Sequence, residues 1–311
     1  MRQPLVEFDE YIAPDGEMYK FRDGVEKFVI SGTNGLGLPR INYRTQRGPF
    51  QDGETVLGFV LEPRTLTLIH RHNGCSRQEY WDMRAELLNV TRPNRQSLTE
   101  FATGILRKRL PDNSQRDLNV LISSGLQFND NPAKWDEFSV QPVVQFIAHD
   151  PVLFNPIQES ASFVNFVALG ELVFPITFDA DGIVFNSDDI QLSTSVTTVG
   201  TYKTFPLIVI TGPITNPSIT NATINTKIEL NTTINAGVIA TISLEFGNKT
   251  VVDNNGDNLI GFLSTDSDLA NFRLEVDPTA TDGLNTINVS GSNINENTAI
   301  TMSWFDRYIG I

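Results

Sequence analysis

The sequence contains very few of the residues that build covalent or metal-bound frameworks. One cysteine, Cys75, and three histidines occur among 311 residues. Intrachain disulfides and metal sites built from several cysteines are therefore excluded. No run approaches the roughly 20 apolar residues that a membrane-spanning helix needs, and Met1–Lys20 has acids and prolines where a secretory signal has an apolar stretch. We expect a chain that folds in a reducing cytoplasm and does not insert into a membrane.

Basic residues are scarce in the second half of the chain. Residues 1–160 hold 18 Lys+Arg and 21 Asp+Glu, a net charge of 18 − 21 = −3. Residues 161–311 hold 5 and 16, a net charge of 5 − 16 = −11. A nucleic-acid-binding protein gains affinity by neutralising phosphates, so it should carry a basic excess. Neither half does, and the acidic balance favours a soluble protein that repels polyanions.

The composition predicts two domains, residues 1–155 and 160–311. The first is rich in arginine and mixes strands and turns with one helix, whereas the second is rich in Thr, Asn, Ser, Ile and Val. The segment "HDPVLFNPIQES", His149–Ser160, carries two prolines and is the expected linker. Two short strand-like runs around Asp23-Gly24 predict a hairpin. "TLTLI", Thr65–Ile69, alternates as a half-buried strand does.

One helix is predicted in "SRQEYWDMRAELLNVTRP". Ser76 can cap its start, with Glu79 at the capping-box spacing, and Pro93 ends it. Its apolar stripe comprises Tyr80, Met83, Leu87 and Val90, widened by Ala85 and Leu88.

The second domain is expected to be β throughout. Its β-branched runs alternate, and turn signals recur at about the 8–12-residue spacing of sandwich strands. The expected strands include Leu172–Asp179, Ile190–Gly200 and Ala299–Ile311, and Asn255-Gly256 is expected at the tip of a hairpin. A sandwich of two sheets is the natural solution.

His149 and Asp150 stand where a strand ends, which is a common place for catalytic groups. Neighbouring strand residues point to opposite faces, and Asp before Pro is a frequent turn residue. No Gly-x-Ser-x-Gly motif is present, and Cys75 has no evident partner. We therefore interpret His149-Asp150 as a turn, and the sequence predicts no enzyme and no catalytic or cofactor-binding residues.

Two further segments have weak metal-site character. His70 and His72 share one strand face, but a zinc site needs three or four ligands and no acidic residue is close. Asp253–Asn258, "DNNGDN", lacks the spacing and closing glutamate of a calcium loop. A strand end and a hairpin turn are the preferred interpretations, so no metal is expected.

The segment Gly32–Gly53 predicts an extended arm or long hairpin that leaves the body of the domain. Its glycines and prolines exclude a helix, so its closely spaced glycines present no helix N-terminus to a phosphate. Arg40, Arg44 and Arg47 are either solvated there or clamp an acidic neighbour. Among the last residues, Trp304, Phe305 and Tyr308 are expected to fill the sandwich core rather than to bind sugar or a partner.

Several of these stretches, in this order, resemble the distal tail protein family of long-tailed phages. They are "TQRGPFQDGETVLGFVLEPRTLTLI", "SRQEYWDMRAELLNVTRPN" and "VQFIAHDPVLFNP", in which Asp150, Pro151 and Phe154 match the family's domain junction. "GPITNPSITN", "VVDNNGDNLIGFL", "LNTINVSG" and "WFDRYIGI" are similar to the family's C-terminal sandwich. The resemblance spans nearly the whole chain.

The resemblance implies a mainly β fold. A tail-tube-like β-barrel or sandwich domain with one flanking helix would be followed by a galectin-like, carbohydrate-binding-like β-sandwich. Six copies would form a ring at the virion tail tip, joining the tail tube protein to the tail-tip hub protein. The arm Gly32–Gly53 would reach the neighbouring subunit, the sandwich would dock a receptor-binding protein, and DNA would pass through the lumen without specific binding. The alternative function is a carbohydrate-binding tail adhesin that itself recognises the host surface.

Overall fold

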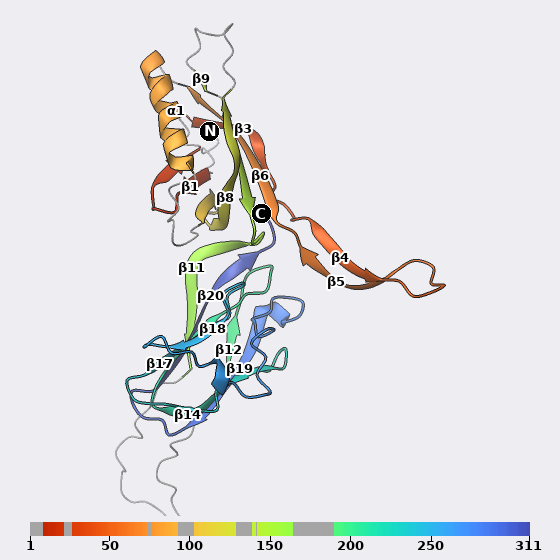
Figure 1. Ribbon diagram of the computed structural model, residues 1–311, viewed down its shortest axis with the longest axis vertical. Helices are drawn as coiled ribbons and strands as arrows, with labels where there is room; N and C mark the ends of the chain where they lie inside the picture. The colour runs from red at the N-terminus through yellow and green to blue at the C-terminus, as the bar shows by residue number, and fades with distance from the viewer. Residues whose placement is uncertain are drawn as a thin grey trace, which may run out of the picture. The chain divides into compact units, whose positions relative to one another are not determined.

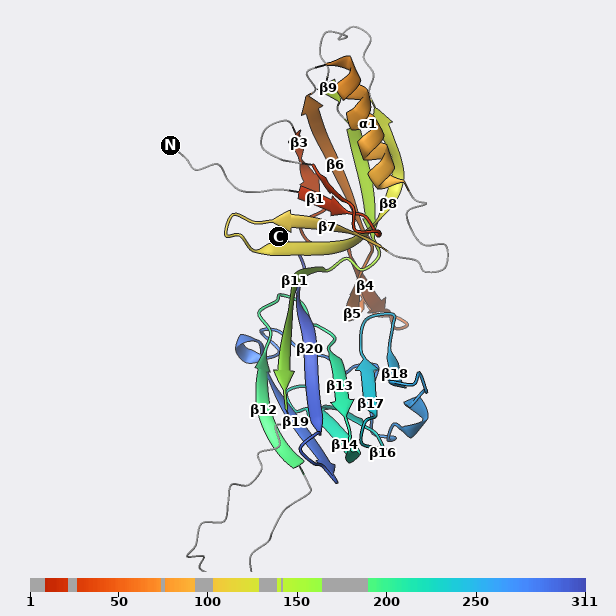
Figure 2. The ribbon, with the colours of Figure 1, turned by 90° about the vertical axis from the view of Figure 1, so that its left-hand side faces the viewer.

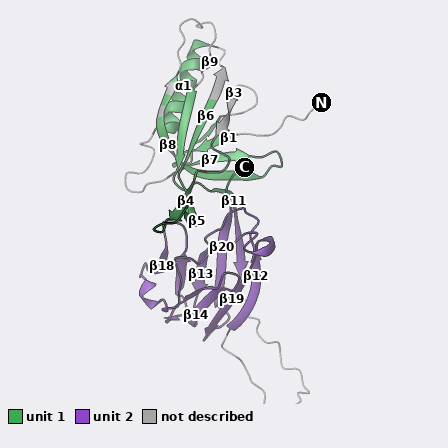
Figure 3. Cartoon of the chain, turned by 90° about the vertical axis from the view of Figure 1, so that its right-hand side faces the viewer, with its two compact units in different colours: residues 1–156, 308–311 green, residues 157–307 purple. Residues whose placement is uncertain are grey.

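The protein is mainly β, with a single helix in the part of the chain that the computed structural model describes. That part comprises residues 9–21, 27–73, 76–92, 103–128, 139–140, 142–163 and 190–311. The chain divides into two compact units, one of residues 1–156 and 308–311 and the other of residues 157–307 (Figure 3). The mainly β class predicted from the sequence is confirmed.

In the first unit a long strand, β8 (Gln115–Phe128), is shared by two sets of antiparallel strands. Its first half pairs with β7 (Gly104–Arg109), which is followed by β1 (Asp9–Ile12) and β2 (Met18–Lys20). Its second half pairs with β10 (Pro142–Ala148), and beyond it lie β6 (Arg64–Asn73) and β3 (Lys27–Asn34), with β9 (Ser139–Val140) also on β6. Both sets therefore depend on β8 for their position.

The predicted strand Thr65–Ile69 is confirmed within β6, where Leu66 and Leu68 are fully buried. The predicted hairpin at Asp23-Gly24 is wrong as a pairing. The two flanking strands do not pair with each other in the described chain. Instead β2 pairs with β1, and β3 pairs with β6. The dipeptide itself lies outside the described residues.

The helix α1 (Arg77–Thr91) begins as its sequence predicts. The Ser76 hydroxyl accepts a hydrogen bond from the Glu79 backbone N–H at 3.2 Å. Met83, Leu87 and Val90 are buried, whereas Ala85 and Leu88 are exposed, so the predicted widening of the stripe is wrong. A single sheet needs only one narrow stripe from the helix that lies along it (Figure 2). Pro93, the expected stop, lies outside the described residues.

The strands β4 (Ile41–Gln46) and β5 (Thr55–Leu61) form a two-stranded sheet of their own, and in the described chain they pair only with each other. We call this hairpin, Ile41–Leu61, the arm; Figure 1 shows it leaving the body of the first unit. The predicted arm, Gly32–Gly53, is thus displaced along the chain. The first residues of the predicted arm belong to the body of the first unit, because β3 runs to Asn34 and Pro39 is buried.

The second unit is a sandwich of two antiparallel sheets. One has the order β18-β17-β13-β20-β11, and the other β12-β19-β14-β15 with β16 beside β14. The strands are β11 (Leu153–Ser162), β12 (Ile190–Thr197), β13 (Leu207–Thr211), β14 (Ile214–Asn221), β15 (Thr226–Glu229), β16 (Thr233–Ile234), β17 (Ile239–Ser243), β18 (Thr250–Asp253), β19 (Leu284–Ser292) and β20 (Ala299–Tyr308), with 3-10 turns at Ile260–Phe262 and Thr281–Gly283. Buried residues of both sheets, such as Ile210, Ile219 and Ile300, form one core. The expected strand Leu172–Asp179 lies outside the described residues.

The predicted linker His149–Ser160 contains the point where the chain passes from the first unit to the second, but most of it forms the strand β11 instead of a loop. Proline disfavours central strands because it has no backbone N–H to donate. Pro156 nevertheless lies within β11, as the last residue before the second unit begins, and in the strand order β11 stands between β20 and β8. The chain thus enters the second unit inside β11 and leaves it inside β20. Tyr308–Ile311 belong to the first unit, which the sequence did not predict.

Candidate interaction surfaces

The residues around His149 form a turn, as interpreted from the sequence. The strand β10 ends at Ala148, and the carboxylate of Asp150 accepts the backbone N–H of Val152 at 3.3 Å. His149 is exposed. An aspartate that accepts the N–H two residues ahead closes an Asx turn, so the role of Asp150 seen here is structural.

The structure describes the side chains of only one of the two weak metal-site candidates. His70 and His72 lie in β6, paired with Val29 and Lys27 of β3, but their side chains and Cys75 lie outside the described residues. In the loop Asp253–Asn258, the Asp253 carboxylate accepts the N–H groups of Asn255 and Asp257, both at 2.8 Å. These bonds lower the pKa of Asp253, the bond from Asp257 most strongly. The carboxylate therefore closes the predicted turn at Gly256, whose φ is +88°.

The arm exposes an unusual amount of apolar surface. Tyr43 and Phe59 face each other across the strand pair and are 59% and 54% exposed. Exposed apolar side chains also include Phe50, Val56, Leu57 and Val60. Two-stranded hairpins are marginally stable in water by themselves, and contiguous apolar patches mark interaction sites. The arm is therefore the strongest candidate for a protein-binding element in the described chain.

The arginines near the arm contact their own chain. Arg40 forms an ion pair with Glu62 at 3.2 Å, and Arg47 Nε donates to the Gln51 carbonyl at 3.1 Å. Arg44 is exposed on β4. Arg40 thus binds an acidic residue of its own chain. That these arginines clamp an acidic group of a second molecule stays a prediction.

A buried arginine fixes the C-terminal residues to the first unit. Arg64 is 3% exposed, and its Nη1 and Nη2 donate to the carbonyls of Gly35 and Ile309, each at 2.7 Å. Burial lowers the pKa of Arg64. Gly35 has a φ of +100°, and a side chain there would collide with the Thr65 carbonyl. Sequence reasoning missed this clamp, because nothing distinguishes Arg64 from the chain's exposed arginines.

The three C-terminal aromatic residues divide between different environments. Trp304 is buried in the sandwich core, as predicted. Phe305 points outward and is 38% exposed, so the prediction is wrong for it because successive strand residues alternate. Tyr308 packs against the core of the first unit instead, with the Arg116 guanidinium 3.6 Å from its ring centre.

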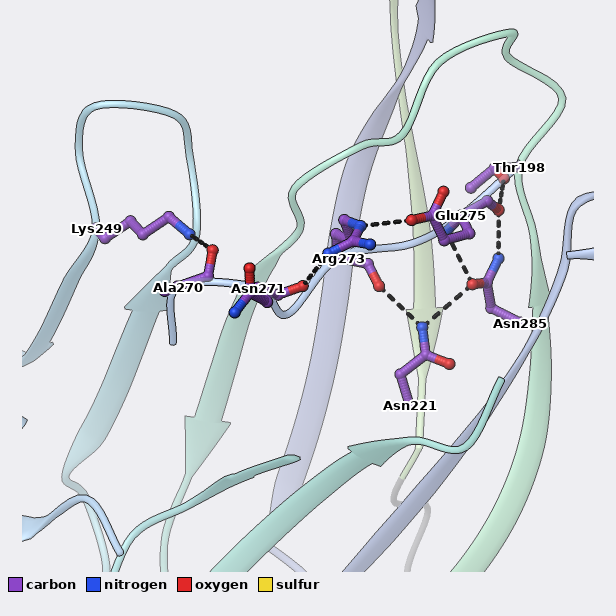
Figure 4. A network of polar contacts seen from close by, with 8 residues as sticks. All are labelled: Thr198, Asn221, Lys249, Ala270, Asn271, Arg273, Glu275 and Asn285. Atoms are coloured by element: carbon purple, nitrogen blue, oxygen red, sulfur yellow. Dashed lines mark hydrogen bonds and ion pairs between the residues drawn. The ribbon is translucent and has the colours of Figure 1, made fainter. Parts of the chain in front are cut away.

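A buried polar network holds one irregular segment of the sandwich, Ala270–Glu275 (Figure 4). Asn285 donates to the Glu275 carbonyl at 2.8 Å and accepts the Glu275 N–H at 2.9 Å. Asn221 donates to the Arg273 carbonyl at 2.8 Å, and Thr198 donates to the Glu275 carbonyl at 2.9 Å. Both asparagines are fully buried. The side chains of Arg273 and Glu275 are thus presented from a fixed backbone.

Two negative findings concern the described residues. They contain no group of three or more His, Cys, Asp or Glu side chains placed to hold a metal ion. None of their helices is long and apolar enough to span a bilayer.

The sequence matches no family model and no curated protein. In three dimensions the chain is similar to the crystal structure of the Dit protein of phage SPP1, described as a paradigm of the hub adsorption apparatus in phages that infect Gram-positive bacteria. The TM-score is 0.60 at 14% identity, and the match covers 97% of this chain and 99% of that one. The chain therefore has the fold of a phage Dit protein from end to end.

The chain also matches the phage P2 baseplate in its activated conformation with Ca, with a TM-score of 0.48 at 10% identity, over 96% of this chain and 98% of that one.

Proposed function

We propose that this protein is a structural component of a phage tail tip, a distal tail adaptor rather than an enzyme. The observation that carries the proposal is the fold shared with the SPP1 Dit protein over 97% of this chain and 99% of that one. The likeness spans both units, so it is not a single common β-sandwich matched by chance. The order of sequence motifs quoted above supports the same class independently.

The proposed assembly is a homohexameric ring built by the first unit. A closed ring needs head-to-tail contacts between two different patches of each subunit. The arm supplies one patch, because its exposed Tyr43 and Phe59 would be buried against a neighbouring copy. The site that receives the arm would lie on the body of that neighbour. The ring would join the tail tube protein to the tail-tip hub protein.

The remaining parts of the proposal follow from charge and topology. Residues 1–160, which would form the ring, have a net charge of −3 and so no basic excess, which suits a conduit for DNA, since a basic lumen would retain the polyanion by counterion release. The second unit, a galectin-like sandwich in this proposal, would face outward and dock a receptor-binding protein. The protein would act at the virion tail tip after folding in the host cytoplasm.

The ring is tested by measuring mass in solution. We expect a species of six times 34.6 kDa by light scattering and native mass spectrometry, with rings visible by electron microscopy. The double variant Tyr43→Ser, Phe59→Ser should remain folded but associate at least about tenfold more weakly, because central aromatic residues dominate binding energy. Phe246→Ser, which changes an exposed aromatic side chain of the second unit, is the control.

Two outcomes would count against the proposal in different ways. A wild-type protein that stays monomeric at high concentration, and forms no ring with its neighbouring tail proteins, contradicts the adaptor itself. Rings of unchanged stability in the double variant refute only the role of the arm.

A further inference from the structure

The few basic residues of the second unit are gathered at one place. Residues 161–311 contain five Lys and Arg, and four of them, Lys203, Lys249, Arg273 and Arg307, surround the rings of Tyr202 and Phe205 or act electrostatically on one another. The fifth, Lys227, forms ion pairs with Glu229 and Asp266 elsewhere. In a segment with a net charge of −11, such a concentration of positive charge is unexpected. We call the four residues the cation cluster.

Cations and aromatic rings alternate in the cluster. The Arg307 guanidinium lies 5.7 Å from the Tyr202 ring centre and 5.8 Å from that of Phe205. Lys203 Nζ is 5.8 Å from the Tyr202 centre, and Lys249 Nζ is 5.3 Å from the Phe205 centre. A cation over a ring face is attracted by the ring quadrupole. The rings thus help to keep several like charges close together.

The backbone under the cluster is fixed by hydrogen bonds. Tyr202 forms a β-bridge with Arg307, and Thr204 forms one with Leu274. Lys249 Nζ donates to the carbonyl of Leu269 at 2.8 Å and to that of Ala270 (Figure 4). The buried network described above holds the segment that carries Arg273. Four separate stretches of chain therefore meet at a site whose geometry exists before any ligand arrives.

The cluster carries more positive than negative charge. Glu275 pairs with Arg273, and Asp268 acts on Lys249 although its carboxylate also caps the backbone N–H of Asn271. Asp306 lies on the opposite face of β20 from Arg307 and accepts the N–H of Val199. Among the described residues, the two carboxylates of Glu275 and Asp268 act on members of a cluster of four cations, so positive charge is in excess there. In the described part of the chain Lys203 forms no ion pair, and Glu275 is the carboxylate that acts on it.

We propose that the cation cluster binds a phosphate group carried by an otherwise neutral sugar. A phosphate monoester carries about two negative charges and several strong acceptor oxygens, which suits a site with an excess of positive charge. The aromatic rings beside the cations offer the flat surface that sugar rings contact. An extended polyanion, such as a nucleic acid or a highly acidic peptide, would be repelled by the surrounding acidic unit. The inference does not depend on ring formation.

The test is calorimetric titration of the full-length protein at constant ionic strength. The probes are inorganic phosphate, glucose 6-phosphate and glucose. We expect both phosphate probes to bind and glucose not to. Lys203→Met should weaken binding roughly tenfold or more, because it removes one charge-assisted hydrogen bond, and Lys203→Arg should retain binding. Lys227→Met makes the same charge change outside the cluster and should bind as the wild type does.

Three results would overturn the inference. One is absence of phosphate binding by the wild type, and another is equal affinity in Lys203→Met and Lys227→Met, which would show diffuse attraction. The third is tighter binding of a short acidic peptide than of glucose 6-phosphate, which would assign the cluster to a protein partner. Thermal melting of each variant confirms that the fold is intact.

Discussion

Lys203 shows how much the charge of one residue depends on its surroundings. Burial lowers the pKa of its ammonium from the ordinary value of 10.5, and the like charges of Arg273 and Arg307 lower it further. Glu275 opposes this shift. A charged group held this way opposes folding, since the unfolded chain solvates it better. Residues that weaken a fold in this manner are typical of binding sites.

Replacing Lys203 should therefore stabilise the protein in a pH-dependent way. Below the lowered pKa the wild type bears the full cost of the charge, so Lys203→Met should unfold at a slightly higher denaturant concentration. The gain should stay below about 1 kcal/mol, because much of the ammonium remains in water. Between the lowered pKa and 10.5 the unfolded wild type binds more protons, so its stability rises with pH.

The advantage of Lys203→Met should thus shrink as the pH rises toward 10.5. Urea unfolding of both proteins at several pH values measures it. A difference that is constant or grows with pH would show that the Lys203 charge does not oppose folding.

Elements with strong local signals could be predicted from the sequence, and those that depend on distant partners could not. Ser76 caps α1 through a hydrogen bond from the N–H of Glu79, three residues later, and this local contact does not depend on tertiary structure. The strands of the sandwich follow from alternation alone. The hairpin at Asp23-Gly24 was predicted wrongly, because a turn signal does not say which strands will pair, and in the structure β3 pairs with the distant strand β6. The clamp at Arg64 and the cation cluster join residues far apart in sequence, so no spacing could reveal them.

The contacts of the asparagines in the buried network could not be predicted from the sequence either. Asn221 and Asn285 lie within stretches similar to the tail protein family, yet sequence alone does not say what their amides contact. In the structure they replace a strand partner for Arg273 and Glu275, whose backbone would otherwise lack hydrogen bonds in the interior.

Asn285→Ala should destabilise the sandwich by about 1–3 kcal/mol, because the buried N–H of Glu275 loses its acceptor and the carbonyls of Glu275 and Gly283 each lose one of their donors. Hydrogen exchange followed by mass spectrometry should show faster exchange in Arg273–Gly283. Asn248→Ala changes an exposed asparagine and should leave both quantities unaltered. Equal stability of the two variants would mean that the network is dispensable.

At the scale of the whole molecule, the second unit is an insertion within the first. The chain leaves the first unit inside β11 and returns through β20, and Tyr308–Ile311 complete the first unit. Arg64 and the backbone hydrogen bond from the Ile311 N–H to the Leu36 carbonyl, at 3.1 Å, fix these C-terminal residues in place. The stability of the first unit thus depends on the final four residues of the sequence.

Arg64→Met should lower the unfolding free energy of the first unit by about 2 kcal/mol, since the carbonyls of Gly35 and Ile309 lose a charged donor. The Ile311 amide should exchange faster, whereas amides of the sandwich should not change. Arg44→Met alters an exposed arginine and should have little effect. Unchanged exchange at Ile311 would show that the tail is held without Arg64.

The insertion has a mechanical consequence. The sandwich is tethered by two peptide segments instead of one, so a pulling force on it divides between two covalent paths. A single proteolytic nick within the sandwich leaves both fragments attached to the rest of the molecule. In the proposed role as a docking domain, the sandwich would stay attached to the first unit after one such break in its chain.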